Sequence, residues 1–150
     1  MVPTGLYFED FRVGAKYRTA DHTVSASEIL EFARLTGDNN PLHVDAKFAR
    51  AAGFDDVIAH GLLVQSLAVG LVADLGIMRG TTIALLSTQA RFIAPTGAGD
   101  TIHVEMRITR KRLAHDGLRG VLWRRAWIVK QGGEIVADVR FVNLMRVRRP

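Results

Sequence analysis

The sequence predicts a two-layer α+β fold in which an antiparallel sheet curls around one buried helix. Residues 62–74 read LLVQSLAVGLVAD, and nine of these 13 residues are apolar. Placed on a helix, they point in nearly every direction around the axis, which is typical of a helix covered on all sides. After residue 80 apolar and polar residues alternate, which is the pattern of half-buried strands. A single apolar helix followed by several strands favours a sheet that wraps the helix.

The length and composition fit one globular domain spanning residues 1–150. Apolar residues make up 48% and charged residues 23% of the 150, enough to bury a core. The chain has no cysteine, so disulfides and thiolate zinc sites are excluded. The start, MVPTGLYFEDF, lacks the features of a signal peptide, and the apolar run 62–73 is shorter than the ~18 residues of a membrane span. We therefore expect a cytoplasmic protein without a membrane partner.

The positive charge lies in the second part of the chain. Residues 101–150 hold 12 Lys+Arg and 4 Asp+Glu, a balance of +8, whereas residues 1–100 hold 8 and 11, a balance of −3, for a total of +5. Such a surface can meet nucleic acid, a membrane or a phosphate-bearing molecule. The arginines alternate with apolar residues in strand-like segments. This pattern favours a solvated outer sheet face, and we expect no nucleic-acid partner.

The elements before the buried helix carry clear boundary residues. One strand is expected near residues 16–24, and a helix is expected over about 26–36. Ser25 and Glu28 form a capping-box pattern, and Gly37 suits the left-handed residue after a helix. Asp45 and Gly53 frame a second, short helix, and Gly76 closes the buried one.

Four strands follow the buried helix. They are expected at 81–93, 102–109, 120–130 and 135–141, with a hairpin turn in QGGE at 131–134. Because these strands are sequential and joined by short turns, an antiparallel sheet is predicted.

The segment FARLTGDNNPLHVD, residues 32–45, places an acid and a histidine where a helix must stop. Pro41 resists a continuous helix and Asn39 and Asn40 favour turns, so we expect a bend that directs Asp38 and His43 into one cleft. Such a pair can orient and deprotonate a water. Alternatively, Asp38 and Asn40 cap helix ends and His43 only packs.

A second candidate is Ala59-His60-Gly61, directly before the buried helix. Without a side chain, Gly61 lets a ligand oxygen approach its N–H, which lies at a helix N-terminus that favours negative charge. The alternative is a glycine required by a tight entry turn, with His60 as a hydrogen-bonded structural residue. Metal binding is not expected, because no two histidines have ligand spacing on one element.

These motifs resemble the R-specific enoyl-CoA hydratases of the MaoC-like dehydratase family. The resemblance rests on GDNNPLHVD at 37–45 and AHGLL at 59–63 followed by the apolar helix, and LYFEDFRVG at 6–14 and APTGAGDTI at 94–102 are also similar. It implies a hotdog fold, a bent antiparallel sheet wrapped around a long central helix. It also implies reversible hydration of trans-2-enoyl thioesters to (R)-3-hydroxyacyl thioesters, without metal or redox cofactor.

The resemblance further implies a role for each motif residue. Asp38 and His43 would activate water and transfer protons, the Gly61 N–H would bind the thioester oxygen, and Asn40 and His60 would support the catalytic loop. Some relatives carry a serine at the position of Val69, a side chain that cannot form hydrogen bonds.

The implied partners are the thioester substrate and a second copy of the chain. The acyl carrier would be coenzyme A, as part of the substrate, or an acyl carrier protein, and some basic residues would meet its phosphates. Hotdog proteins usually form homodimers. Two other functions stay open: a hotdog thioesterase, which would release a thiol, and a non-catalytic acyl-CoA-binding regulatory module.

Overall fold

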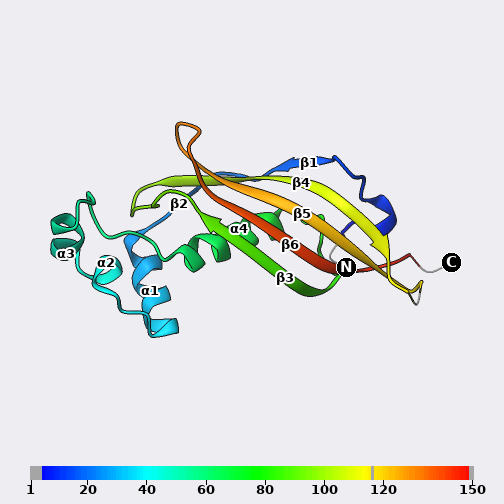
Figure 1. The fold of residues 1–150 in the computed structure, drawn as a ribbon, viewed down its shortest axis with the longest axis horizontal. Coiled ribbons are helices and arrows are strands. Elements are labelled where there is room, and N and C mark those ends of the chain that lie inside the picture. The colour runs from blue at the N-terminus through cyan, green and yellow to red at the C-terminus, as the bar shows by residue number, and fades with distance from the viewer. Residues whose placement is uncertain (1–4, 116, 149–150) are drawn as a thin grey trace.

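A long antiparallel sheet carries one long helix on its inner face and three short helices at one end (Figure 1). This architecture comes from a computed structural model that describes residues 5–115 and 117–148. The helices are η1 (Phe8–Asp10), α1 (Ala26–Thr36), α2 (Pro41–Val44), α3 (Ala46–Ala51) and α4 (Gly61–Asp74). The strands are β1 (Lys16–Arg18), β2 (His22–Thr23), β3 (Thr82–Phe92), β4 (Thr101–Leu113), β5 (Arg119–Lys130) and β6 (Ile135–Arg146). The predicted α+β class is confirmed.

The strand order is β1-β4-β5-β6-β3, with β2 also paired to β4. Strands β4, β5 and β6 form the expected meander, but β3 pairs with β6 and is not a neighbour of β4. The segment 93–100 crosses from one edge to the other, and it bonds to the chain that leads into α4. Ala59 N–H donates to the Thr96 carbonyl at 2.7 Å, and Ala98 N–H donates to the Val57 carbonyl at 3.3 Å. These contacts fix the position where α4 begins.

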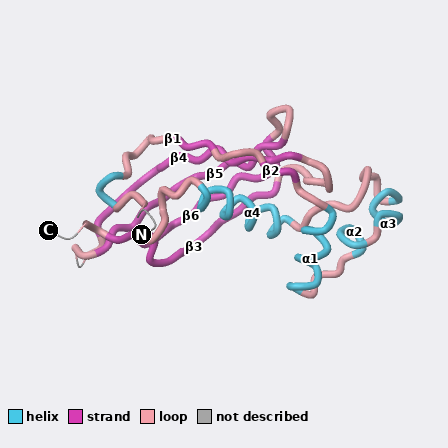
Figure 2. The backbone as a smooth tube through the Cα atoms, turned by 180° about the vertical axis from the view of Figure 1, so that it is seen from behind, coloured by secondary structure: helices cyan, strands magenta, loops and turns pink. Residues whose placement is uncertain are grey.

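Helix α4 lies against the inner face of the sheet, as Figure 2 shows from behind. Its buried residues are Leu63, Val64, Ala68 and Val72. The expectation that it is buried on all sides is wrong for the single chain, because Leu62 is 63% and Val69 39% exposed. The sheet covers one side of the helix and leaves a second apolar side open. Among the described residues, no helix has the length and apolar character to cross a bilayer.

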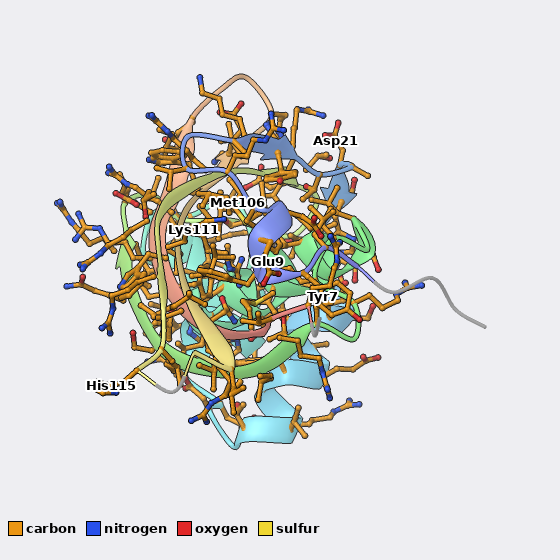
Figure 3. The ribbon with its side chains drawn as sticks, turned by 90° about the vertical axis from the view of Figure 1, so that its right-hand side faces the viewer. Tyr7, Glu9, Asp21, Met106, Lys111 and His115 are labelled. Carbon is orange, nitrogen blue, oxygen red and sulfur yellow. The ribbon has the colours of Figure 1, made fainter. Side chains whose placement is uncertain are left out.

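The outer face of the sheet carries arginines that alternate with apolar residues, as predicted, although Arg124 of β5 is buried on the inner face. The guanidinium of Arg110 lies 4.7 Å from the Trp123 ring centroid, and that of Arg125 lies 4.8 Å from Trp127. Arg125 also forms a two-bond ion pair with Asp138. Figure 3 shows nitrogen-tipped side chains projecting outward from the strands.

The far end of the sheet is closed by η1. Lys111 of β4 donates to the carbonyls of Phe8, Glu9 and Phe11 at 3.2, 3.1 and 2.7 Å. Its ammonium lies 4.8 Å from the Phe8 ring centroid, and Lys111 and Glu9 are labelled beside η1 in Figure 3. These contacts fix the N-terminal segment at the end of the sheet opposite to α1, α2 and α3 (Figure 1).

Helix α1 is fixed at both ends by the residues that the sequence indicated. The Ser25 hydroxyl accepts from the Glu28 N–H at 3.2 Å, and the Glu28 carboxylate accepts from the Ser25 N–H at 2.7 Å. Gly37 ends the helix with φ 78° and donates its N–H to the Ala33 carbonyl at 2.8 Å. The chain therefore leaves α1 at a defined angle, directly before Asp38.

We expect Ser25→Ala to destabilise the protein by about 1 kcal/mol, because it leaves a helix N-terminal donor without its cap. Chemical denaturation gives the free energy of unfolding. Ser27→Ala is the matched control, since the exposed Ser27 hydroxyl lies 3.1 Å from Ser25 Oγ but caps no backbone N–H, and its loss should change stability by less than about 0.5 kcal/mol. Equal effects in the two variants would contradict a specific capping role.

Candidate active site

The exit of α1 and the entry of α4 lie side by side, which brings three polar residues together. Asp38 follows Gly37 in the loop after α1, His43 lies on α2, and His60 is the N-cap of α4. One side-chain ligand atom from each lies within 4.8 Å of the others. The predicted convergence of Asp38 and His43 is therefore present, and His60 joins them.

The chain bends after Asp38 and does not continue α1, as predicted, and a short helical turn that was not expected begins at Pro41. Proline is tolerated at the first helical position, because that N–H has no intrahelical partner. Pro41 takes this position in α2, and the Asn40 side-chain oxygen caps the turn by accepting from the Leu42 N–H at 3.1 Å. The cap orients α2, and with it His43.

His43 is held in one tautomer by the chain before α4. Its Nδ1 lies 2.6 Å from the Ile58 carbonyl oxygen, which can only accept, so Nδ1 carries the proton. In the neutral ring Nε2 then keeps its lone pair and can accept a proton. The half-buried His43 side chain is therefore set up as a base.

His60 connects the loop after α1 with the α2 turn from the buried side. Its Nε2 donates to the Asp38 carbonyl at 2.9 Å, and its ring stacks on His43 with centroids 3.7 Å apart and planes 28° apart. The Phe32 ring lies 5.1 Å away on α1. His60 is 3% exposed, and its Nδ1 has no hydrogen-bond partner within residues 5–115 and 117–148. His60 therefore contacts both residues, the backbone carbonyl of Asp38 and the ring of His43.

The Asp38 carboxylate is accessible to solvent. Its side chain is 58% exposed, Oδ1 accepts from the Asn40 N–H at 3.3 Å, and Oδ2 lies 4.0 Å from His60 Nε2. Asn39 turns away, because its side-chain amide donates to the Gly37 carbonyl at 3.2 Å. The loop therefore presents one exposed carboxylate close to the two stacked histidines.

Gly61 begins α4, and its N–H donates to no residue in the described part of the chain. A Cβ at this position would lie 3.0 Å from the Phe92 ring, so a larger residue would require Phe92 to shift. Gly61 also lines a cavity of about 290 Å³ with Val64, Phe92, Val136 and residues 93–96. Asp38 and His43 do not line this cavity in the single chain. Their link to Gly61 is His60, the preceding residue.

Phe32 and Phe92 were not singled out in the sequence, although one packs on His60 and the other covers Gly61. Nothing local marks them, because each looks like an ordinary apolar residue of a helix or strand. On α4 the hydroxyl of Ser66 donates within its own helix, to the Leu62 carbonyl at 2.8 Å.

Asp38, His43 and His60 are close enough to be considered as a metal site. Zinc requires lone pairs that converge on one point about 2 Å from each nitrogen. Lone pairs lie in the ring planes, and two planes stacked 3.7 Å apart and tilted by 28° do not meet at a point close to both rings; each ring also has one nitrogen bonded to a carbonyl. The donor geometry does not suit a metal ion, and the absence of a metal cofactor stays a prediction.

Comparison with known proteins identifies relatives of the whole fold. A family model described as MaoC like domain matches residues 10–121. The chain is 36% identical over 134 residues to the 3-hydroxybutyryl-CoA dehydratase of Methylorubrum extorquens, covering 89% of this chain and 80% of the relative. It is 34% identical over 104 residues to the (R)-specific enoyl-CoA hydratase of Aeromonas caviae, covering 69% and 75%. Against Protein MaoC of Klebsiella aerogenes it is 32% identical over 129 residues, 83% of this chain but only 38% of that protein.

A solved structure from Archaeoglobus, described as a monoamine oxidase regulatory protein, superimposes with a TM-score of 0.90 at 31% identity and covers 99% of both chains. The (R)-hydratase of A. caviae superimposes with a TM-score of 0.75 at 30% identity, covering 90% of this chain and 97% of the other. The hotdog expectation is confirmed. With the family model matched over most of its length, this chain belongs to the MaoC-like dehydratase family of hydro-lyases.

Proposed function

We propose that the protein adds water reversibly to trans-2-enoyl thioesters and forms (R)-3-hydroxyacyl thioesters. The observation that carries this proposal is the pairing of Asp38 with a histidine whose free Nε2 can accept a proton. The relatives named as a dehydratase and an (R)-specific hydratase support it.

Three chemical tasks make up the reaction, and the site has a group for each. As the water oxygen attacks C3, His43 Nε2 takes one water proton and the exposed Asp38 carboxylate orients the other. The electron pair of the C2–C3 double bond moves to C2 and the thioester oxygen as an enolate. The imidazolium of His43 then returns the proton to C2, so atoms and charge balance.

The Gly61 N–H is proposed as the donor to the thioester oxygen. Its position at the start of α4 adds the positive end of the helix dipole, which favours the enolate charge. One donor of this kind typically lowers the barrier by ~2.7–4 kcal/mol. Asn40 and His60 contribute by holding the loop, through the α2 cap and the stacked ring.

A second copy of the chain is proposed to cover the open side of α4 and the edge of β3. Leu62, Val69, Ile83, Leu85 and Phe92 are each between 39% and 63% exposed in the single chain. Burying such apolar side chains is favourable, and an unpaired edge strand is a natural pairing surface. A homodimer formed there would enclose the cavity next to Gly61. Coenzyme A or an acyl carrier protein would bring the acyl group, with surface arginines near its phosphates.

We expect Asp38→Asn and His43→Gln each to lower the rate of crotonyl-CoA hydration by at least about 10², because each removes a proton-handling group. Loss of absorbance at the enoyl-thioester band gives the rate. Asp55→Asn and His115→Gln are matched controls on exposed residues outside the site and should keep wild-type activity.

Two outcomes would contradict the proposal. If Asp38→Asn and His43→Gln both hydrate crotonyl-CoA at the wild-type rate, Asp38 and His43 do not have the proposed proton-handling roles. Release of free thiol from the substrate, detected with a thiol reagent, would indicate a thioesterase.

We expect Gly61→Ala to lower kcat by between about 10 and 10³-fold, since the new methyl group must displace Phe92 or move the amide donor. Gly70→Ala is the matched control on the same helix, because a Cβ there meets nothing within 4 Å. It should keep activity and gain up to about 1 kcal/mol of stability from helix propensity. A fully active Gly61→Ala variant would show that the amide is not a donor to the substrate.

A further inference from the structure

Arg124 is a charged residue on the inner face of the sheet. Its strand β5 alternates, and the inward neighbours Leu122, Ala126 and Ile128 are at most 1% exposed. Arg124 occupies the same face and is 4% exposed. The next residue, Arg125, faces outward and is paired with Asp138.

The bonds of Arg124 leave part of its guanidinium unused. Nε donates to the Asn143 side-chain oxygen at 2.9 Å, and Nη1 donates to Met106 Sδ at 3.4 Å. The guanidinium lies 4.2 Å from the Phe141 ring centroid, and Met106 is labelled on β4 in Figure 3. Within residues 5–115 and 117–148, Nη2 has no acceptor and no carboxylate pairs with Arg124.

Asn143 has a free donor as well. An arginine can only donate, so the amide oxygen of Asn143 must face Nε, and its NH₂ group points elsewhere. That NH₂ group donates to no residue in the described ranges. The two side chains together therefore present unused donors and a positive charge, which is the complement of an acceptor-only anion.

The charge of Arg124 persists in this environment. Burial lowers the pKa of Arg124 to about 10, so the side chain stays protonated at neutral pH. An unpaired buried charge is strongly unfavourable, whereas a hydrogen-bonded pair offsets its desolvation. The structure of the single chain supplies no such pair, which points to a partner from outside.

Arg124 and Asn143 line a cavity of about 210 Å³ whose other walls are mainly apolar. Val69, Val72 and Ala73 of α4 form one wall, and Leu85 of β3 lies at the edge. No other basic side chain among the described residues lines it. One guanidinium matches the single charge of a carboxylate, and the apolar walls suit an alkyl chain that carries it.

We propose that this cavity binds a carboxylate at the distal end of the acyl group, so that the preferred substrates are ω-carboxy enoyl thioesters. This inference rests on the proposed hydratase function. Val69 lies eight residues after Gly61, about 12 Å along the helix axis. An extended chain covers roughly 1.2 Å per bond, so on the order of ten bonds separate the thioester carbon from the carboxylate.

The test compares matched pairs of CoA thioesters that differ only at the distal end. The substrates are trans-2-enoyl-CoAs with a methyl or a carboxylate terminus. Their chains have about 6, 8, 10 and 12 carbons, which brackets the span of about ten bonds. We expect kcat/KM to favour the carboxylate by at least about tenfold near ten carbons. Arg124→Met should abolish this preference and leave the methyl-terminated rate within about threefold.

Two further variants keep the test decisive. Arg124→Lys keeps the positive charge but loses the two parallel guanidinium donors and the Nε bond to Asn143. It should therefore reduce the preference for the carboxylate terminus, and it serves as the test if Arg124→Met does not fold. Arg140→Met is the matched control, because Arg140 is exposed on the outer face and should keep the preference.

Failure of this inference is distinguishable from failure of the proposed function. Hydration of methyl-terminated substrates without any carboxylate preference would overturn the inference and leave the hydratase standing. If neither series is hydrated, calorimetry still tests whether the cavity binds a carboxylate, by comparing the affinities of the saturated decanoyl and ω-carboxydecanoyl thioesters. An affinity gain from the carboxylate that needs Arg124 supports the cavity, and equal affinities overturn it.

A carboxylate from a second copy of the chain is the competing occupant. In that case Arg124→Met would convert a dimer to monomers in sedimentation experiments without changing the acyl preference. That result would also overturn the inference.

Discussion

The active-site region depends on one set of contacts around the first residue of α4. His60 donates to the Asp38 carbonyl and stacks on His43, while His43 donates to the carbonyl of Ile58. These contacts join the exit of α1, the α2 turn and the entry of α4, and the Ile58 N–H adds a bond to the Leu42 carbonyl at 3.1 Å. Because two carbonyls and one nitrogen of each ring are paired in these bonds, displacing either histidine leaves polar groups unpaired.

The same contacts explain why the site can do acid–base chemistry. Both histidines bond a carbonyl, and a carbonyl can only accept, so each ring has a defined proton position. Solvent reaches the Asp38 carboxylate but hardly reaches His60, so the exposed carboxylate lies over a buried imidazole that supports the loop. The geometry thus separates the residues that would touch substrate from those that hold them.

The fold leaves two features that a single chain does not satisfy by itself. One side of α4 and the β3 edge expose apolar side chains, and the inner face of β5 carries a guanidinium without a carboxylate. The other inward residues of β5 near Arg124 are apolar, and no carboxylate among the described residues pairs with its guanidinium. A ligand that supplies an acceptor would complete its hydrogen bonds.

Local sequence patterns identified most of the elements and several of their ends, although the strand expected near residues 16–24 is two strands, β1 and β2. The Ser25–Glu28 capping box, the left-handed Gly37 and the alternating strands depend on residues a few positions apart, so they can be recognised in the chain itself. The motif from Asp38 to His43 and the glycine before the apolar helix also identified the candidate site. The α2 turn was not foreseen, because proline can begin a helical turn as well as prevent a continuous helix.

Only the tertiary structure decided how these elements meet. The placement of β3 beside β6, the half-open α4, the stack of His43 on His60 and the cavity between Arg124 and Asn143 all join residues far apart in the chain. Such contacts are selected by the packing of the whole core, in which one alternating strand looks like another until its partners are known. The sequence by itself therefore determined which residues could react, and the three-dimensional packing decided which of them face one another.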